Sequence, residues 1–131
     1  MRTLTRLSVV ALVGAGTLIP MTAASAADSV TRSGACSGTT AWTMRAAEAA
    51  GDQAALRLTI DSTRAGQAWR VQLSRQGTQF FSTQRTTDAQ GNVTVSRSAP
   101  EVSKVDDVYT ARARNLRTGE ICSARVVLPE H

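Results

Sequence analysis

Residues 105–128 read VDDVYTARARNLRTGEICSARVVL, and this stretch decides the fold. Apolar or small residues alternate with polar ones, and a period of two places alternate side chains on opposite faces of a strand. The alternating apolar set is Tyr109, Ala111 and Ala113 in the first half and Cys122, Ala124, Val126 and Leu128 in the second. Thr118-Gly119 between the halves is a turn signal. The stretch predicts an antiparallel hairpin with one buried face.

The same alternation recurs in shorter stretches upstream. They lie at residues 42–46, 56–61, 69–74, 80–81 and 93–96, with turn signals between them. Residues 42–50 are rich in alanine and leave strand or helix open, and we prefer a strand. Only one of Phe80 and Phe81 is expected to point inward. The predicted core is Trp42, Leu56, Leu58, Ile60, Trp69, Val71, Leu73, Val93, Val95, Tyr109, Ala111, Ala124 and Val126.

The first 26 residues have the pattern of a signal peptide. Two arginines precede a mostly apolar run over residues 7–18, and small residues stand at Ala24 and Ala26. We predict a signal-peptide helix over 1–26, cleavage after Ala26 or Ala27, and a secreted, extracellular protein. The alternative is an uncleaved membrane anchor, but the apolar run is shorter than the about 20 residues that span a bilayer. After cleavage no membrane association is expected.

Chain length and charge suit one soluble domain. Residues 27–35 form a short polar stretch, which we predict to be a flexible leader. We predict that residues 36–129 form a single β-sandwich domain. The chain carries 15 basic and 10 acidic residues. Removal of the two arginines of the signal peptide lowers the formal charge from +5 to +3. This charge is weak evidence for nucleic-acid binding, because a solvated surface explains it equally well.

The two cysteines of the chain, Cys36 and Cys122, both lie in the part predicted to be exported. An even count in an oxidising compartment predicts one disulfide. Two separate thiols at metal or catalytic sites would need histidine partners, and the one histidine is His131 at the end of the chain.

About seven short strands separated by turn signals are typical of an all-β, immunoglobulin-like or fibronectin-III-like antiparallel sandwich. Trp69 stands on the third predicted strand, where such sandwiches often bury a tryptophan. The segment 107–113 resembles the tyrosine corner that leads into strand F of immunoglobulin domains. A Cys36–Cys122 bond would then tie the first strand to the last.

Four segments carry a wider resemblance: CSG at 36–38, AGQAWRVQL at 65–73, TARARN at 110–115 and TGEICSA at 118–124. Together they are similar to small exported actinobacterial proteins of unknown function. The resemblance covers nearly all of the mature chain. It implies a secreted β-sandwich and transfers no catalytic residue.

The sequence lacks the residues of common catalytic and metal chemistry. Nucleophilic catalysis needs an internal base, and a zinc site needs Cys and His at ligand spacing. Asp106 and Asp107 are adjacent and would point to opposite faces of a strand, which is unsuitable for a two-carboxylate site. We read them instead as a solvated start of that strand. The sequence therefore predicts a protein that is not an enzyme and holds no metal or cofactor.

The candidate binding residues are arginines. Arg70, Arg112, Arg114 and Arg125 all fall at outward positions of predicted strands that would share one sheet. Arginine grips phosphate or carboxylate with two parallel hydrogen bonds. We predict a monomeric interaction module whose partner is an anionic cell-envelope polymer or an acidic secreted protein. The competing interpretation is that these arginines only keep the sheet soluble.

The alternative function is another protein–protein interaction factor or a secreted protease inhibitor. An inhibitor needs a rigid exposed loop, and residues 99–104 are the one candidate. Nucleic acid is not an expected partner, because aromatic side chains do not interleave with the basic ones.

Overall fold

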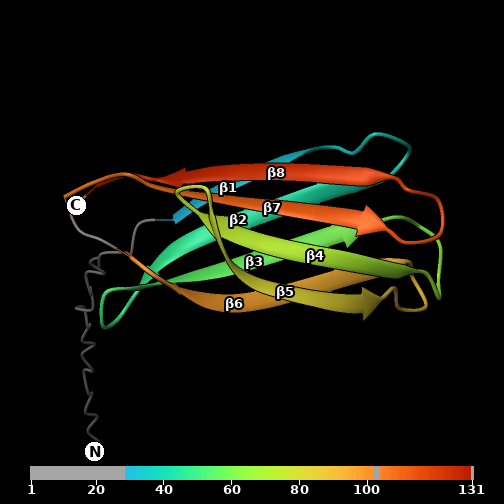
Figure 1. Cartoon of the computed structure of the whole chain (residues 1–131), viewed down its shortest axis with the longest axis horizontal. Helices are drawn as coiled ribbons and strands as arrows, with labels where there is room; N and C mark the ends of the chain where they lie inside the picture. Colours follow the sequence, from blue (N-terminus) through green and yellow to red (C-terminus); the bar gives the residue numbers. More distant parts are fainter. Residues whose placement is uncertain (1–28, 102–103, 131) are drawn as a thin grey trace, which may run out of the picture.

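The computed structural model describes residues 29–101 and 104–130, which form two packed antiparallel sheets (Figure 1). The strands are β1 (Ser29–Ala35), β2 (Ala41–Ala49), β3 (Gln53–Asp61), β4 (Ala68–Arg75), β5 (Thr78–Thr86), β6 (Asn92–Pro100), β7 (Asp107–Asn115) and β8 (Ile121–Leu128). The described residues contain no helix. The predicted signal peptide at 1–26 lies outside them.

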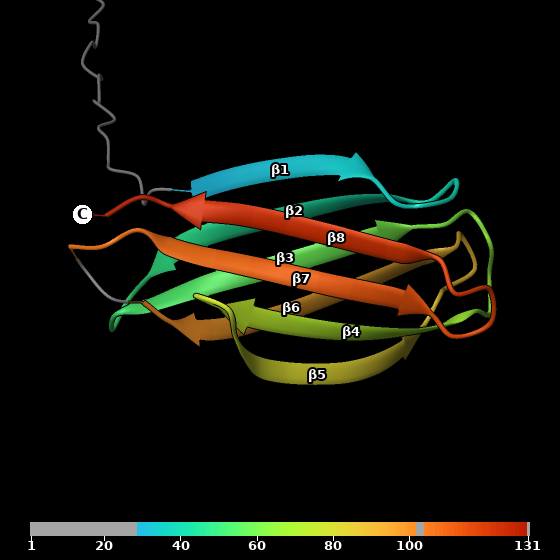
Figure 2. The ribbon, with the colours of Figure 1, turned by 45° about the horizontal axis from the view of Figure 1, so that its top comes forward.

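Sheet A has the strand order β1-β2-β3-β6 and sheet B the order β5-β4-β7-β8. Figure 2 shows the two layers, with β1 of sheet A beside β8 of sheet B at one edge of the sandwich. The predicted β-sandwich is therefore confirmed. The described residues contain eight strands rather than about seven.

The hairpin predicted from residues 105–128 is formed by β7 and β8. Ala111 pairs with Ala124 and Ala113 with Cys122, so the small apolar residues of both strands share one face. Gly119 in the connecting turn has a φ of 79°, a conformation that glycine adopts without strain. This face packs against sheet A.

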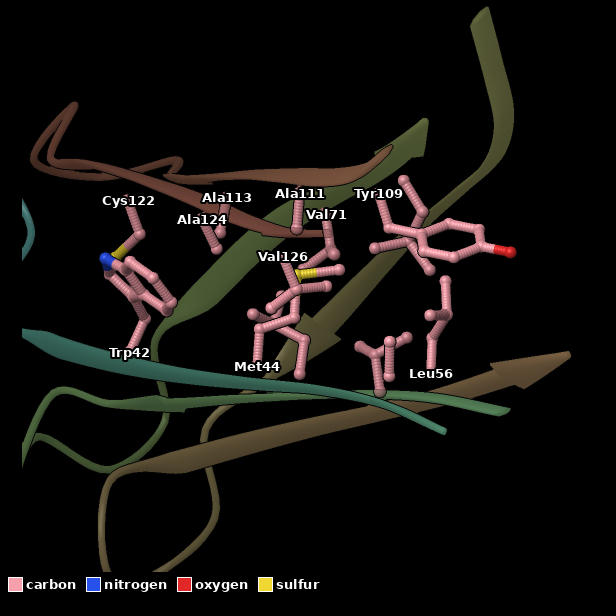
Figure 3. Packing of buried hydrophobic residues seen from close by; sticks show 14 of the residues in the cluster. Trp42, Met44, Leu56, Val71, Tyr109, Ala111, Ala113, Cys122, Ala124 and Val126 are labelled. Carbon is pink, nitrogen blue, oxygen red and sulfur yellow. The ribbon is translucent and has the colours of Figure 1, made fainter. Parts of the chain in front are cut away.

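The core fills the space between the sheets (Figure 3). All thirteen predicted core residues are buried. The same cluster also contains Met44, Ala46, Ala54, Ala99, Ala113, Cys122 and Leu128. Trp69 and Tyr109 are its largest fully buried side chains. Their burial supplies much of the hydrophobic free energy of folding, because aromatic side chains remove the most apolar surface from water.

The alanine-rich segment 42–50 forms strand β2 up to Ala49, as preferred, and not a helix. Trp42, Met44 and Ala46 alternate inward, and β2 pairs along its length with β1 and β3. Helix propensity of the alanines is outweighed by burial of one face of the strand.

Strand β1 lies where we expect a flexible leader. Residues Ser29–Ala35 pair in register with β2, although Val30 is their one large apolar side chain. A Cβ at Gly34 would come within 2.8 Å of the indole of Trp42. Glycine at this position lets the indole of Trp42 lie against β1.

The predicted disulfide is present and joins the two sheets. Cys36 directly follows β1, and Cys122 lies in β8. Next to the bond, Ser37 N donates to Ile121 O at 2.8 Å and Ile121 N donates to Ser37 Oγ at 3.0 Å. Figure 3 shows the Trp42 indole beside the Cys122 sulfur.

Phe80 and Phe81 both pack against the core, so the expectation that only one points inward is wrong. The β4–β5 register shifts between Leu73 and Ser74, which leaves Phe80 as an extra residue on β5. A bulge of this kind breaks the alternation of faces. Arg97 of β6 covers the ring of Phe81, with its guanidinium carbon 4.2 Å from the ring centre. This contact spans the sheets at the edge opposite β1 and β8.

Candidate functional site: an arginine face

The outer face of sheet B carries all four predicted binding residues, and we call it the Arg face. Arg70 comes from β4, Arg112 and Arg114 from β7, and Arg125 from β8, and all four side chains are exposed. Their sequence neighbours on both sides face the core or are partly buried, as the alternation requires.

Strand register decides which of these arginines meet. Arg70 stands directly opposite Arg114 across the β4–β7 ladder. Arg112 stands opposite Ser123, and Arg125 opposite Thr110. Side chains directly opposite each other on neighbouring strands have Cβ atoms about 5 Å apart. The strand register therefore places Arg70 and Arg114 side by side and the other two arginines within a few residues of them.

Negative charge is missing from the Arg face. The four strands of sheet B contain a single acid, Asp107, and that side chain is buried on the inner side. Within residues 29–101 and 104–130 the one salt bridge is Arg75–Asp107, so no ion pair with a described residue neutralises the four arginines. The face presents uncompensated positive charge to solvent.

A shallow depression of about 370 Å³ lies on the Arg face. Arg112 and Arg125 stand on its border, and the small residues Ala111 and Ala124 contribute to its lining. Its remaining lining is hydroxyl and amide side chains, including Gln72 and Thr110. The depression can take a small anionic group with hydrogen-bond donors around it.

Asp107 is not solvated, contrary to our reading of the Asp106-Asp107 pair. It is 1% exposed and accepts a hydrogen bond of 2.7 Å from Arg75 Nε. A carboxylate this deeply buried requires a paired cation, because an unpaired charge would cost several kcal/mol. Asp107 is therefore part of the interior of the sandwich and not of its solvated surface.

Tyr109, two residues further on, is fully buried and donates its phenol proton to Pro100 O at 2.9 Å. Burial, aided by the negative charge of Asp107 and opposed by Arg75, raises the pKa of Tyr109 to about 12. The phenol anchors β7 to the end of β6 across the two sheets.

At the other end of the sandwich from Tyr109, the loops that connect the strands meet around a second cavity, which the sequence did not indicate. We call it the loop-end cavity. It measures about 390 Å³ and is lined by the connections 36–40, 62–67 and 116–120, with Asn115. Glu120 is its central acid: it accepts hydrogen bonds from Gly38 N at 2.8 Å, Thr40 N at 2.9 Å and Thr40 Oγ1 at 2.7 Å.

Burial acts to raise the pKa of Glu120, but the hydrogen bonds from Thr40 and Gly38 and the charge of Arg64 outweigh it, so the pKa is lowered. The carboxylate thus clamps the β1–β2 connection onto the β7–β8 turn. A sequence signal for this contact did not exist, because Glu120 and Thr40 are 80 residues apart.

The β3–β4 and β5–β6 connections are pressed together beside this cavity. A Cβ at Gly91 would lie 2.3 Å from Arg64 N, so only glycine fits. Thr63 has a φ of 61°, a strained conformation for a β-branched residue. The hydrogen bonds around the loop-end cavity hold these connections in one arrangement.

The loop suggested for protease inhibition is not an exposed loop over its first half. Ala99 lies in β6 and is fully buried, and Glu101 is 7% exposed with its N–H bonded to Asp52 O. Residues 102 and 103 lie outside the described part. The segment that the structure shows offers no extended convex loop.

In the described part of the chain, no group of three or more His, Cys, Asp or Glu side chains could hold a metal ion. Residues 29–101 and 104–130 include no helix of the length and apolarity needed to cross a membrane.

Comparison with known proteins gives no relative: no protein-family model, no curated protein and no solved structure matches this chain.

Proposed function

We propose that this protein is an exported, non-catalytic interaction module that binds an anionic cell-envelope polymer through the Arg face. The observation that carries the proposal is the directly opposed Arg70–Arg114 pair on a face without acids. Like charges directly opposite each other destabilise a sheet. A phosphate or carboxylate between the two guanidinium groups turns this repulsion into attraction.

Arginine is chemically suited to this ligand. The guanidinium group stays charged at any physiological pH and presents donors in a planar fork that matches carboxylate and phosphate. The hydroxyl and amide groups around Arg112 and Arg125 add neutral donors and acceptors for the rest of the polymer.

The strand order supports a finer description of the fold. We propose a fibronectin-III-like sandwich, with β2-β3-β6 as one sheet and β5-β4-β7-β8 as the other, to which β1 adds an N-terminal edge strand. Trp69 on β4 and Tyr109 at the start of β7 occupy the positions expected for such sandwiches.

Export after removal of residues 1–26 is part of the proposal. A disulfide between Cys36 and Cys122 supports it, since such bonds persist in oxidising compartments. The proposed kinship with small exported actinobacterial proteins rests on the sequence alone. A role without acid–base catalysis is supported by the single histidine, which is the last residue.

The test is binding of the purified mature chain to inorganic polyphosphate and to polygalacturonate, measured by calorimetry at several salt concentrations. We expect binding that weakens as salt rises, because counterions compete for the arginines. The double variant Arg70→Ser/Arg114→Ser should lose about 100-fold or more in affinity, because charge-assisted hydrogen bonds contribute about 1.5–3 kcal/mol each and about 1.4 kcal/mol is a tenfold change.

The matched control is Arg32→Ser/Arg117→Ser, which removes the same charge from two exposed positions outside the Arg face. Equal losses in the two double variants would show that net charge alone attracts the polymer, and the proposal would be wrong. Absence of binding by the unmodified protein would also refute it.

A further inference from the structure

The outer face of sheet A holds a second direct arginine pair. Arg45 of β2 stands opposite Arg57 of β3 in the ladder between the two central strands. Both side chains are exposed. In the same cross-strand row lie Thr31 of β1 and Ser96 of β6, which are small hydroxyl residues. The row therefore contains two cations and no anion.

The nearest acid of this face is too far away to neutralise the pair. Asp61 is the outward acid of β3, four residues after Arg57. At about 3.3 Å per residue the Cα atoms of Asp61 and Arg57 are about 13 Å apart. Within the described residues neither Arg45 nor Arg57 has a salt bridge.

A shallow hollow accompanies this pair, as one does on the Arg face. It measures about 350 Å³, and its lining includes Arg45, Arg57, Ala55, Ser96 and Ser98. Both outer faces thus carry an opposed arginine pair on their central strands and a hollow with arginine and hydroxyl side chains in its lining, which on sheet A are the paired arginines themselves and on the Arg face are Arg112 and Arg125.

We infer that the outer face of sheet A is a second anion-binding site, and that one molecule of this protein bridges two strands of the same anionic polymer. The inference rests on the proposed function and extends it from binding to cross-linking. Its ligand is a phosphate or carboxylate group of a second polymer strand, which charge complementarity selects. The two faces point away from each other across the packed core, so one straight strand cannot occupy both.

Light scattering of the mature chain mixed with polyphosphate, or with polygalacturonate, tests the inference. Bridging predicts that scattering rises as protein is added, passes a maximum and falls when protein is in excess, because the polymer sites are then filled and each molecule holds only one strand. The polymer that gives the maximum identifies phosphate or carboxylate as the recognised group.

Two double variants separate the two faces. Arg45→Ser/Arg57→Ser should still bind polymer through the Arg face but lose the scattering. Arg70→Ser/Arg114→Ser should also lose the scattering, and Arg32→Ser/Arg117→Ser should retain it. All six positions are exposed, so the substitutions leave the core intact.

The outcomes distinguish the two proposals. Undiminished scattering by Arg45→Ser/Arg57→Ser, for example because the protein cross-links as a dimer, would overturn the bridging inference and leave the proposed function standing. Loss of polymer affinity in that variant, together with full affinity in Arg70→Ser/Arg114→Ser, would place the anion site on sheet A alone and refute the proposed function.

Discussion

Tyr109 is the single tyrosine of the chain, so its ionisation can be followed without interference. Its pKa is raised to about 12, mainly by burial. A raised pKa in the folded state means that stability from Tyr109 is complete below the ordinary pKa of 10 and declines as the pH rises through about 12. We predict that phenolate absorbance appears near pH 12 in the native protein and near pH 10 in urea.

Tyr109→Phe is the control for this prediction, because it removes the titrating group and should abolish the alkaline loss of stability above pH 10. A native titration near the ordinary value would mean that the phenol is accessible to water. The contact between Tyr109 and Pro100 would then be wrong.

We predict that the clamp formed by the Glu120 carboxylate on the β1–β2 connection weakens in acid. The pKa of Glu120 is lowered, so its contribution to stability is complete above the ordinary value of 4.5 and is lost as the pH falls through its lower folded value. Glu120→Gln keeps the shape but removes charge and acceptor capacity, and should cost about 1–2 kcal/mol at neutral pH. Urea unfolding at neutral and acidic pH measures both effects.

The matched control is Glu130→Gln, which removes an exposed carboxylate near the C-terminus. It should change stability little at either pH. If Glu120→Gln behaves like this control, the hydrogen bonds to Gly38 and Thr40 contribute nothing to stability and the clamp is refuted.

At the scale of elements, β1 depends on its attachments because it has little apolar surface of its own. The Cys36–Cys122 bond spans 86 positions of sequence, and chain-entropy estimates for such a loop reach about 4.5 kcal/mol. In Cys36→Ser/Cys122→Ser we expect a large loss of global stability. Hydrogen exchange should accelerate most in β1, and equal protection of β1 in both proteins would contradict its dependence on the disulfide.

The β2–β3 pair tests whether the opposed arginines repel each other. Arg57→Thr removes one partner and introduces a residue with high β propensity, and should stabilise the domain by about 0.2–1 kcal/mol at low salt. The gain should shrink at high salt, where the repulsion is screened. Arg32→Thr on β1, opposite Met44, is the control because it adds the same β propensity without relieving a pair. A gain in stability that is independent of salt in both variants would contradict repulsion between Arg45 and Arg57.

At the scale of the whole molecule, the outer face of each sheet carries an opposed arginine pair, and most acids of the described residues lie outside the strands. Binding of polymer to the folded state should raise the unfolding temperature by linkage. At a polyphosphate concentration about 100 times the Kd, the stabilisation is about 2.7 kcal/mol, or an increase of about 10 °C for a domain of this size. Neutral dextran is the control, and an equal increase with dextran would argue for crowding instead of binding.

The alternation of residue types was sufficient to predict seven of the eight strands and the buried face of all of these except β5, where the bulge at Phe80 breaks the alternation. It was also sufficient to place Arg70, Arg112, Arg114 and Arg125 outward. Period two is a property of a strand itself, so these features can be read without knowing its partner. The bond between Cys36 and Cys122 followed from their count and the predicted compartment.

Strand register and long-range contacts were decided by the tertiary structure alone. Residues 29–35 have too few apolar side chains for their sequence to predict a strand. Their pairing with β2 orders them. The bulge at Phe80 brings both phenylalanines inward, because the ladder with β4 slips by one residue. The opposition of Arg45 to Arg57, and the hold of Glu120 on Thr40, arise only when distant segments meet. The periodicity of the sequence predicts to which side of its strand a side chain points. Which residues it meets there depends on how distant segments of the chain pack.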